Sequence, residues 1–183
     1  MQPIFKKPSK EEVAAAVGKK VPDVIAPRLR ILFCGINPGL YSAAVGHHFA
    51  RPGNRFWRGL KEAGLTDRLL SPHEEAELLR MGIGITNLVG RATATADQIS
   101  TGELKRGRGR LEEKIRKYRP RIVAILGMDA YRKAFGSRKV EAGAQEAKIS
   151  TASLWVLPNP SGLNAHYQLS DYARLFRGLR QAS

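Results

Sequence analysis

The sequence is poorest in cysteine, with Cys34 alone among 183 residues. One thiol excludes an internal disulfide and any zinc or iron–sulfur centre that several cysteines would hold. Long apolar runs are missing as well, because no stretch reaches the 18 or so residues that a membrane-spanning helix needs. Residues 1–7 lack the apolar core of a signal peptide. We therefore expect an intracellular protein, cytoplasmic if bacterial, with no membrane partner.

Acidic residues are scarce relative to basic ones. Lys and Arg number 31 against 16 Asp and Glu, which gives a net charge of +15. Such a field attracts polyanions and favours nucleic acid as a partner, although ribosome-associated and membrane-surface proteins share this imbalance. The basic residues between 105 and 121 can either neutralise phosphates or form a solvated helix face.

Apolar strand patterns alternate with helical ones along the chain. The strands are expected over 30–36, 82–89, 121–127 and 153–158. This order predicts an α/β fold: a three-layer α/β/α domain around a central, mainly parallel sheet. Residues 1–27 hold five lysines and four prolines around a short helix, which predicts a mobile basic arm. We expect residues 28–183 to form a single domain.

Two Asn-Pro segments directly follow apolar strands, Gly35–Leu40 after the first and Asn159–Asn164 after the last. Ligands bind at the carboxyl ends of parallel strands, so both segments are expected at one site. Pro38 restricts Asn37 to extended conformations. Its amide can then hold a water or read the edge of a base, but it is too weak to abstract a proton. The alternative is a turn in which Asn37 caps its own backbone.

Two apolar side chains stand among polar loop residues. Phe49 can stack on an extruded base, or it can be a satellite core contact. Leu163 can act as a wedge between base steps, or it can be an ordinary exposed leucine. The adjacent His47 and His48 point apart in an extended segment, which disfavours a metal site.

Five segments in order carry a resemblance that runs from about residue 21 to 179. They are Gly35–Leu40, Gly46–Phe49, Pro52–Trp57, Gly84–Val89 and Asn159–Leu163. Together they resemble the mismatch-specific uracil-DNA and thymine-DNA glycosylase family of the uracil-DNA glycosylase superfamily. The resemblance implies that superfamily's fold and a monofunctional enzyme. Such an enzyme flips uracil, or thymine opposite guanine, out of DNA and hydrolyses its N-glycosidic bond, leaving an abasic site.

The resemblance also implies roles for individual residues. Asn37 would hold the attacking water, and Phe49 would stack on the flipped base. The backbones of Ile36 and Phe49, together with Asn87, would bind the edge of that base. The residues implied at the DNA helix are Ser161, Gly162, Leu163 and Asn164. The family uses no metal or organic cofactor, its partner is double-stranded DNA with uracil or a G:U or G:T mismatch, and we expect a monomer.

Three positions bear on substrate range and catalysis. Ala165 stands where bacterial members tend to carry a basic residue, which favours broader specificity. Asn87 stands where they often carry lysine and is closer to the eukaryotic thymine-DNA glycosylase pattern, so thymine activity stays open. Asp97, the only acid between Glu77 and Glu103, is the candidate for a stronger general base. Its alternative role is a helix cap for the segment that follows.

Two other functions compete with this interpretation. A non-catalytic nucleic-acid-binding module can be built on the same fold, because fold does not determine function. Gly35–Gly39 can also be read as a phosphate loop. That segment lacks the Gly-Lys-Ser/Thr ending of a P-loop and the glycine spacing of a dinucleotide fingerprint, which disfavours the second alternative.

Overall fold

The computed structural model describes residues 7–183 and builds them around a five-stranded sheet in the order β2-β1-β3-β5-β4. Four strands are parallel, and only β4 runs antiparallel to its neighbour β5. The mainly parallel sheet predicted from the apolar runs is thereby confirmed. The strands are β1 (Ile31–Gly35), β2 (Ile83–Asn87), β3 (Ile122–Leu126), β4 (Gly143–Ile149) and β5 (Ala152–Leu157).

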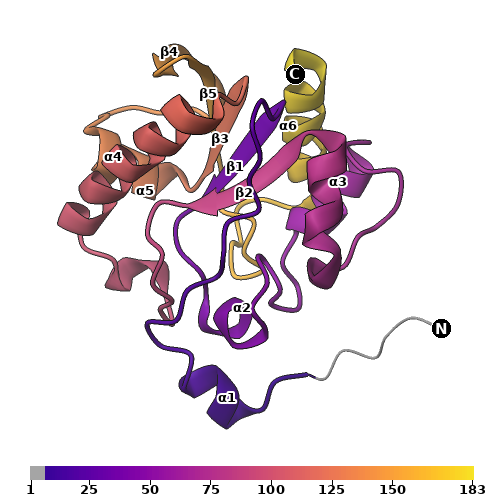
Figure 1. Cartoon of the computed structure of the whole chain (residues 1–183), viewed down its shortest axis with the longest axis vertical. Coiled ribbons are helices and arrows are strands. Elements are labelled where there is room, and N and C mark those ends of the chain that lie inside the picture. Colours follow the sequence, from indigo (N-terminus) through magenta and orange to yellow (C-terminus); the bar gives the residue numbers. More distant parts are fainter. Residues whose placement is uncertain (1–6) are drawn as a thin grey trace.

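Helices cover both faces of the sheet (Figure 1). On one face lie α4 (Thr101–Tyr118) and α5 (Met128–Phe135), and on the other lie α3 (Phe56–Glu62) and α6 (Leu169–Ala182). Side chains alternate along a strand. In β1, Phe33 therefore joins the core under α3 and α6, while Cys34 joins the core under α4 and α5. This is the three-layer arrangement that the sequence predicts.

The start of α4 follows from local capping. Ser100 caps α4, because its side chain accepts a hydrogen bond from the Glu103 amide while the Glu103 carboxylate bonds the Ser100 amide. Residues Pro72–Met81 form a 3₁₀ helix, η1. The sequence patterns did not predict α2 (Leu40–Val45) or β4.

Within the described chain, no helix is long and apolar enough to cross a membrane.

Residues 7–27 lie against the domain, which differs from the free arm expected over residues 1–27. After α1 (Lys10–Ala14), the side chains of Ala16 and Val21 are buried in a small cluster with Ala43. Val24 then pairs with β2 through a backbone bridge. Enough apolar side chains stand between the lysines to anchor this segment. The predicted arm's first six residues lie outside the described part of the chain.

The parallel strands bring four chain segments to one edge of the sheet. β1 and β3 are neighbours in the sheet, and the chain leads from β1 to β2 on one side and from β3 to β4 and β5 on the other. This topological switch point is where open α/β sheets form their ligand crevices. The edge carries the segments after Gly35, Asn87, Leu126 and Leu157.

Candidate active site

A cavity of about 400 Å³ opens at this edge of the sheet. Pockets for small molecules span roughly 300–1,000 Å³, so the cavity has the size of a small-molecule binding site. Asn37 and Leu163 both line the cavity, so the two Asn-Pro segments converge there. Residues at the ends of the four parallel strands complete the wall: Gly35, Asn87, Leu126 and Asn159.

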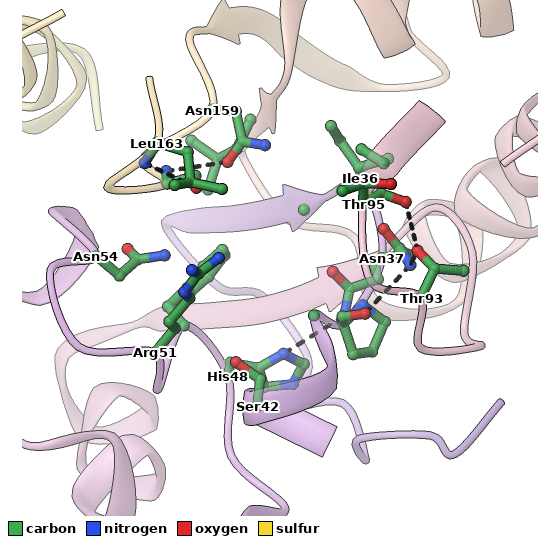
Figure 2. A pocket seen from close by; sticks show the side chains of 18 of the residues that line it. Ile36, Asn37, Ser42, His48, Arg51, Asn54, Thr93, Thr95, Asn159 and Leu163 are labelled. Atoms are coloured by element: carbon green, nitrogen blue, oxygen red, sulfur yellow. Dashed lines mark hydrogen bonds between the residues drawn. The ribbon is translucent and has the colours of Figure 1, made fainter. Parts of the chain in front are cut away.

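The Asn37 side chain is fixed through its amide nitrogen. Nδ2 donates to the carbonyl oxygens of Pro38 and Arg91, at 3.1 and 3.0 Å, and to Thr93 Oγ1 at 2.7 Å. The two carbonyls can only accept. The Thr93 hydroxyl donates its proton to the Thr95 carbonyl at 2.7 Å, so towards Asn37 it also acts as an acceptor. The amide therefore has one possible orientation. Figure 2 shows the nitrogen turned to Thr93 and the oxygen turned away.

This geometry is compatible with both interpretations of Asn37. The bond to the Pro38 carbonyl is a local backbone contact of the kind expected for a turn. The bonds to Arg91 and Thr93 come from a segment more than 50 residues away, and they aim the side chain into the cavity. Among the described residues, no hydrogen bond to Asn37 Oδ1 is found, so the oxygen is available to a water or a ligand.

Asn87 is oriented by His48. Burial lowers the pKa of the His48 imidazole, so the ring is neutral near pH 7. Its Nε2 lies 2.9 Å from the Pro22 carbonyl and must donate there, which leaves Nδ1 to accept from Asn87 Nδ2 at 3.4 Å. The Asn87 oxygen consequently lies over Gly35, and a Cβ on that glycine would collide with it. Only glycine leaves room for the amide in this position.

The segment that carries Phe49 is anchored at several points. The Glu75 carboxylate accepts from the His48 amide at 2.9 Å and bonds His47 Nδ1 at 2.8 Å. Trp57 Nε1 donates to the His48 carbonyl. Phe49 itself adopts a left-handed backbone with a φ of 52°. These contacts fix the backbone that carries the Phe49 ring.

Phe49 has both of the surroundings proposed for it. One side of the ring stacks on Phe56, with centroids 4.2 Å apart, and belongs to the edge of the core. The residue also lines the cavity. A core contact and a stacking surface are therefore compatible, because an aromatic ring has two faces.

The second Asn-Pro segment forms the cavity rim. The Leu163 side chain is 69% exposed, while Ser161 Oγ accepts from the Leu163 amide at 3.3 Å. The Asn164 amide is used inside the loop: Nδ2 donates to the Asn159 carbonyl and Oδ1 accepts from the His166 amide. Asn164 thus shapes the loop, and its predicted contact with DNA stays a prediction, as do those of Ser161, Gly162 and Leu163.

Asp97 lies outside the Asn37 cavity. It is exposed on a 3₁₀ turn, η2 (Ala96–Gln98), and faces a neighbouring cavity of about 360 Å³. A hydrogen bond with the Thr95 side chain lowers the pKa of the Asp97 carboxyl, which makes it a weaker base. The expected cap role is also corrected, because Ser100 caps the helix that follows. The structure does not bring Asp97 to Asn37.

Several cavity residues were not predicted as site residues from the sequence. Thr93 orients Asn37 from 56 positions away, and His48 orients Asn87 from 39 positions away. Figure 2 shows Arg51 and Asn54 across the cavity from Asn37, with Ser42 beside His48. In residues 7–183, no group of three His, Cys, Asp or Glu side chains is arranged to hold a metal ion.

Comparisons with known proteins agree with this architecture. A family model described as the uracil DNA glycosylase superfamily matches residues 22–180. Among solved structures, the chain is similar to the solution NMR structure of a candidate uracil DNA glycosylase from Methanosarcina acetivorans. The identity is 20% and the TM-score is 0.55, over 90% of this chain and 99% of the other. At that identity the structural likeness concerns the fold alone.

Proposed function

Because the chain belongs to the uracil DNA glycosylase superfamily, as the match over residues 22–180 shows, we propose that it is a monofunctional DNA glycosylase. It releases uracil from double-stranded DNA, uracil opposite guanine included, and leaves an abasic site. The net charge of +15 supports a polyanionic substrate. Because a base inside the helix cannot reach a cavity, the target nucleotide has to be flipped out.

One observation supports this proposal most strongly, namely the single orientation of the Asn37 amide. Three acceptors hold Nδ2, so Oδ1 keeps a fixed position at the cavity wall. An oxygen held in this way accepts a hydrogen bond from a water and orients the water's lone pair towards the sugar. Positioning of this kind accelerates a reaction without any change in the protonation of the positioning group.

The other cavity walls suit a pyrimidine. Phe49 offers a ring face for stacking, a contact worth roughly 1–3 kcal/mol in single-strand binders. Asn87 presents Oδ1, because its nitrogen is turned to His48. A carbonyl oxygen in that position accepts the N3–H of uracil or thymine, whereas cytosine carries no N3 proton. The amide orientation therefore favours uracil and thymine over cytosine.

The reaction is a hydrolysis in which the N-glycosidic bond breaks and its electron pair leaves with the base. The water oxygen bonds to C1′ of the sugar, and one water proton neutralises the departing base anion or passes to solvent. The Asn37 amide is too weak a base to take this proton, so the water is not activated as hydroxide. Most of the cleavage of the glycosidic bond therefore precedes the attack of the water. Release therefore depends on how well the base carries negative charge, and uracil should leave faster than thymine.

A base-release assay tests this proposal. The purified protein is incubated with labelled duplexes that carry uracil or thymine opposite guanine or adenine, and with single-stranded uracil DNA. Alkali then cleaves the abasic sites. We expect cleavage of uracil opposite guanine at the highest rate, slower or no cleavage of thymine, and loss of cleavage in Asn37→Ala.

The same assay separates the enzyme from its alternative. A nucleic-acid-binding module would retard the duplexes in a gel and produce no abasic product from any of them. Equal rates for uracil and thymine opposite guanine would contradict the leaving-group argument while keeping the enzyme class.

A further inference from the structure

The loop that exposes Leu163 is held by a guanidinium from the neighbouring segment ahead of α3. Arg55, the residue before α3, donates from one guanidinium nitrogen to two carbonyl oxygens, those of Ser161 at 2.9 Å and Asn164 at 3.0 Å. Its own amide donates to the Pro160 carbonyl at 2.9 Å. The two carbonyls that accept from the Arg55 side chain belong to the residues on either side of Gly162 and Leu163. Arg55 therefore spans the base of the exposed tip.

Backbone packing and a second side chain complete the support. A Cβ on Gly162 would lie 2.7 Å from the Gly53 carbonyl oxygen, so the tip rests directly on the chain ahead of α3. From α6, the Tyr172 hydroxyl donates to the Asn159 carbonyl at 2.6 Å. Burial raises the pKa of Tyr172 to about 12, which keeps the phenol a donor under ordinary conditions. The loop is thus tied to both α3 and α6.

The result of this support is an apolar side chain held in water. Leu163 is 69% exposed, and only Val17 and Leu69 share its status among the large exposed hydrophobic residues of the described chain. A free loop would turn such a side chain inward, because burial of a leucine stabilises by about 1.5–3 kcal/mol. Hydrogen bonds from Arg55 to the flanking carbonyls oppose that collapse.

A guanidinium is suited to this task. Its planar fork presents several N–H donors in fixed directions, whereas the lysine ammonium is a flexible point charge. We propose that Arg55 is a positioning residue that holds Leu163 outward as a wedge for the base stack of duplex DNA. This inference rests on the proposed function, since a wedge serves an enzyme that extrudes a base. Arg55 acts through Leu163 and not on the reacting atoms.

The test uses the full chain with Arg55→Met, which keeps an apolar stem and removes the donors, and Arg55→Lys, which keeps the charge and a flexible donor nitrogen but loses the planar guanidinium. The matched control is Arg58→Met, because Arg58 is exposed on the adjoining helix α3 and its loss changes the net charge equally. Single-turnover uracil release is measured on a duplex with uracil opposite guanine and on the same strand alone.

We expect Arg55→Met to slow release from the duplex by about tenfold, because the leucine no longer offsets the cost of unstacking. Release from the single strand should change less than about twofold, since no stack has to be opened there. Arg55→Lys should fall between wild type and Arg55→Met, and Arg58→Met should match wild type. Full activity of Arg55→Met would overturn the clamp.

A double-mutant cycle and a binding signal separate the clamp from general damage. If Arg55 acts through Leu163, then Arg55→Met combined with Leu163→Ala is no slower than Leu163→Ala alone. In an Asn37→Ala background, 2-aminopurine placed beside the uracil should brighten on binding, and Arg55→Met should abolish that signal. Additive losses, an unchanged signal, or equal losses on both substrates would each overturn the inference.

These outcomes differ from a failure of the proposed function. If the wild-type protein releases no base from any substrate, the glycosylase proposal fails, whereas the 2-aminopurine signal and its dependence on Arg55 still test the clamp. If the wild type releases uracil and Arg55→Met matches Arg58→Met, the clamp alone is wrong.

Discussion

The two Asn-Pro segments follow strands of the same sheet, yet their hydrogen bonds place one side chain inside the cavity and another in solvent. In the first, hydrogen bonds to Arg91 and Thr93 fix a polar side chain, Asn37, at the cavity wall. In the second, hydrogen bonds to the backbone hold an apolar side chain, Leu163, out in solvent. The first loop therefore presents a fixed acceptor to the cavity, and the second presents an exposed apolar side chain at the cavity rim. Under the proposed function, the first serves the chemistry and the second serves the opening of the base stack.

The largest loss of activity should come from a side chain added at Gly35, the first residue of the first segment. In Gly35→Ala the added methyl group collides with the Asn87 oxygen and lies 3.5 Å from the Phe49 ring, so the base has to bind out of place. Misplacement by about 1 Å can cost about 100-fold in rate. We expect kcat/KM for uracil release to fall by about that factor. Gly39→Ala is the control, because its Cβ meets no atom within 4 Å; similar losses in both variants would argue against this account.

A smaller loss should follow when the support behind Asn37 is removed. Thr93→Val keeps the shape of the side chain but deletes the hydroxyl that accepts from Asn37. A hydrogen bond contributes about 0.5–1.5 kcal/mol, which corresponds to roughly 2- to 13-fold in rate. We expect kcat to fall by a factor in that range while KM stays similar. Thr93→Ser restores the hydroxyl and should recover most of the rate; no recovery would mean that the methyl group, not the hydrogen bond, matters.

Truncation of the second segment should depend on the substrate. Leu163→Ala removes the exposed side chain without touching the cavity chemistry, so release from a duplex should slow by about five- to tenfold. On single-stranded uracil DNA the rate should stay within about twofold. Parallel time courses on both substrates measure the ratio, and an unchanged ratio would show that Leu163 takes no part in opening the stack.

The smallest effect concerns stability near the first segment. Burial lowers the pKa of His48 in the folded chain, so the unfolded chain binds a proton first as the pH falls below about 6.5. Stability is then lost progressively towards the folded pKa, and each 1 kcal/mol lowers Tm by roughly 2–4 °C at this chain length. Between pH 7.5 and 5.5, Tm should fall more in the wild type than in His48→Gln. His166→Gln, at an exposed position, should follow the wild type; a parallel fall in all three would remove His48 as the cause.

Sequence patterns predicted those parts of the molecule that repeat or stand out locally. The apolar runs of β1, β3 and β5 are buried strands at nearly the expected bounds. The strand ends then brought Asn37 and Leu163 to one edge, as the parallel topology requires. By contrast, β4 is an edge strand with mostly exposed side chains, so its sequence shows no buried pattern. Residues 7–27 carry many lysines, which concealed the few apolar anchors among them.

The supporting contacts of the site were not predictable in the same way. Thr93 with Asn37, His48 with Asn87, and Arg55 with the carbonyl of Ser161 are pairs 39 to 106 positions apart. Such pairs depend on how loops pack after the sheet has formed, and no local periodicity encodes that packing. Asp97 shows the reverse case: it stands out as an isolated acid, but the fold turns it to a different cavity.

The central claim is that a fixed amide, and not a carboxylate, serves the attacking water. Single-turnover release of uracil opposite guanine, at saturating enzyme, compares wild type with Asn37→Ala and Asp97→Asn, while gel shifts confirm equal DNA binding. The account predicts that Asn37→Ala slows release by about 100-fold or more, whereas Asp97→Asn stays within about twofold. Full activity of Asn37→Ala, or a comparable loss in Asp97→Asn, would contradict it.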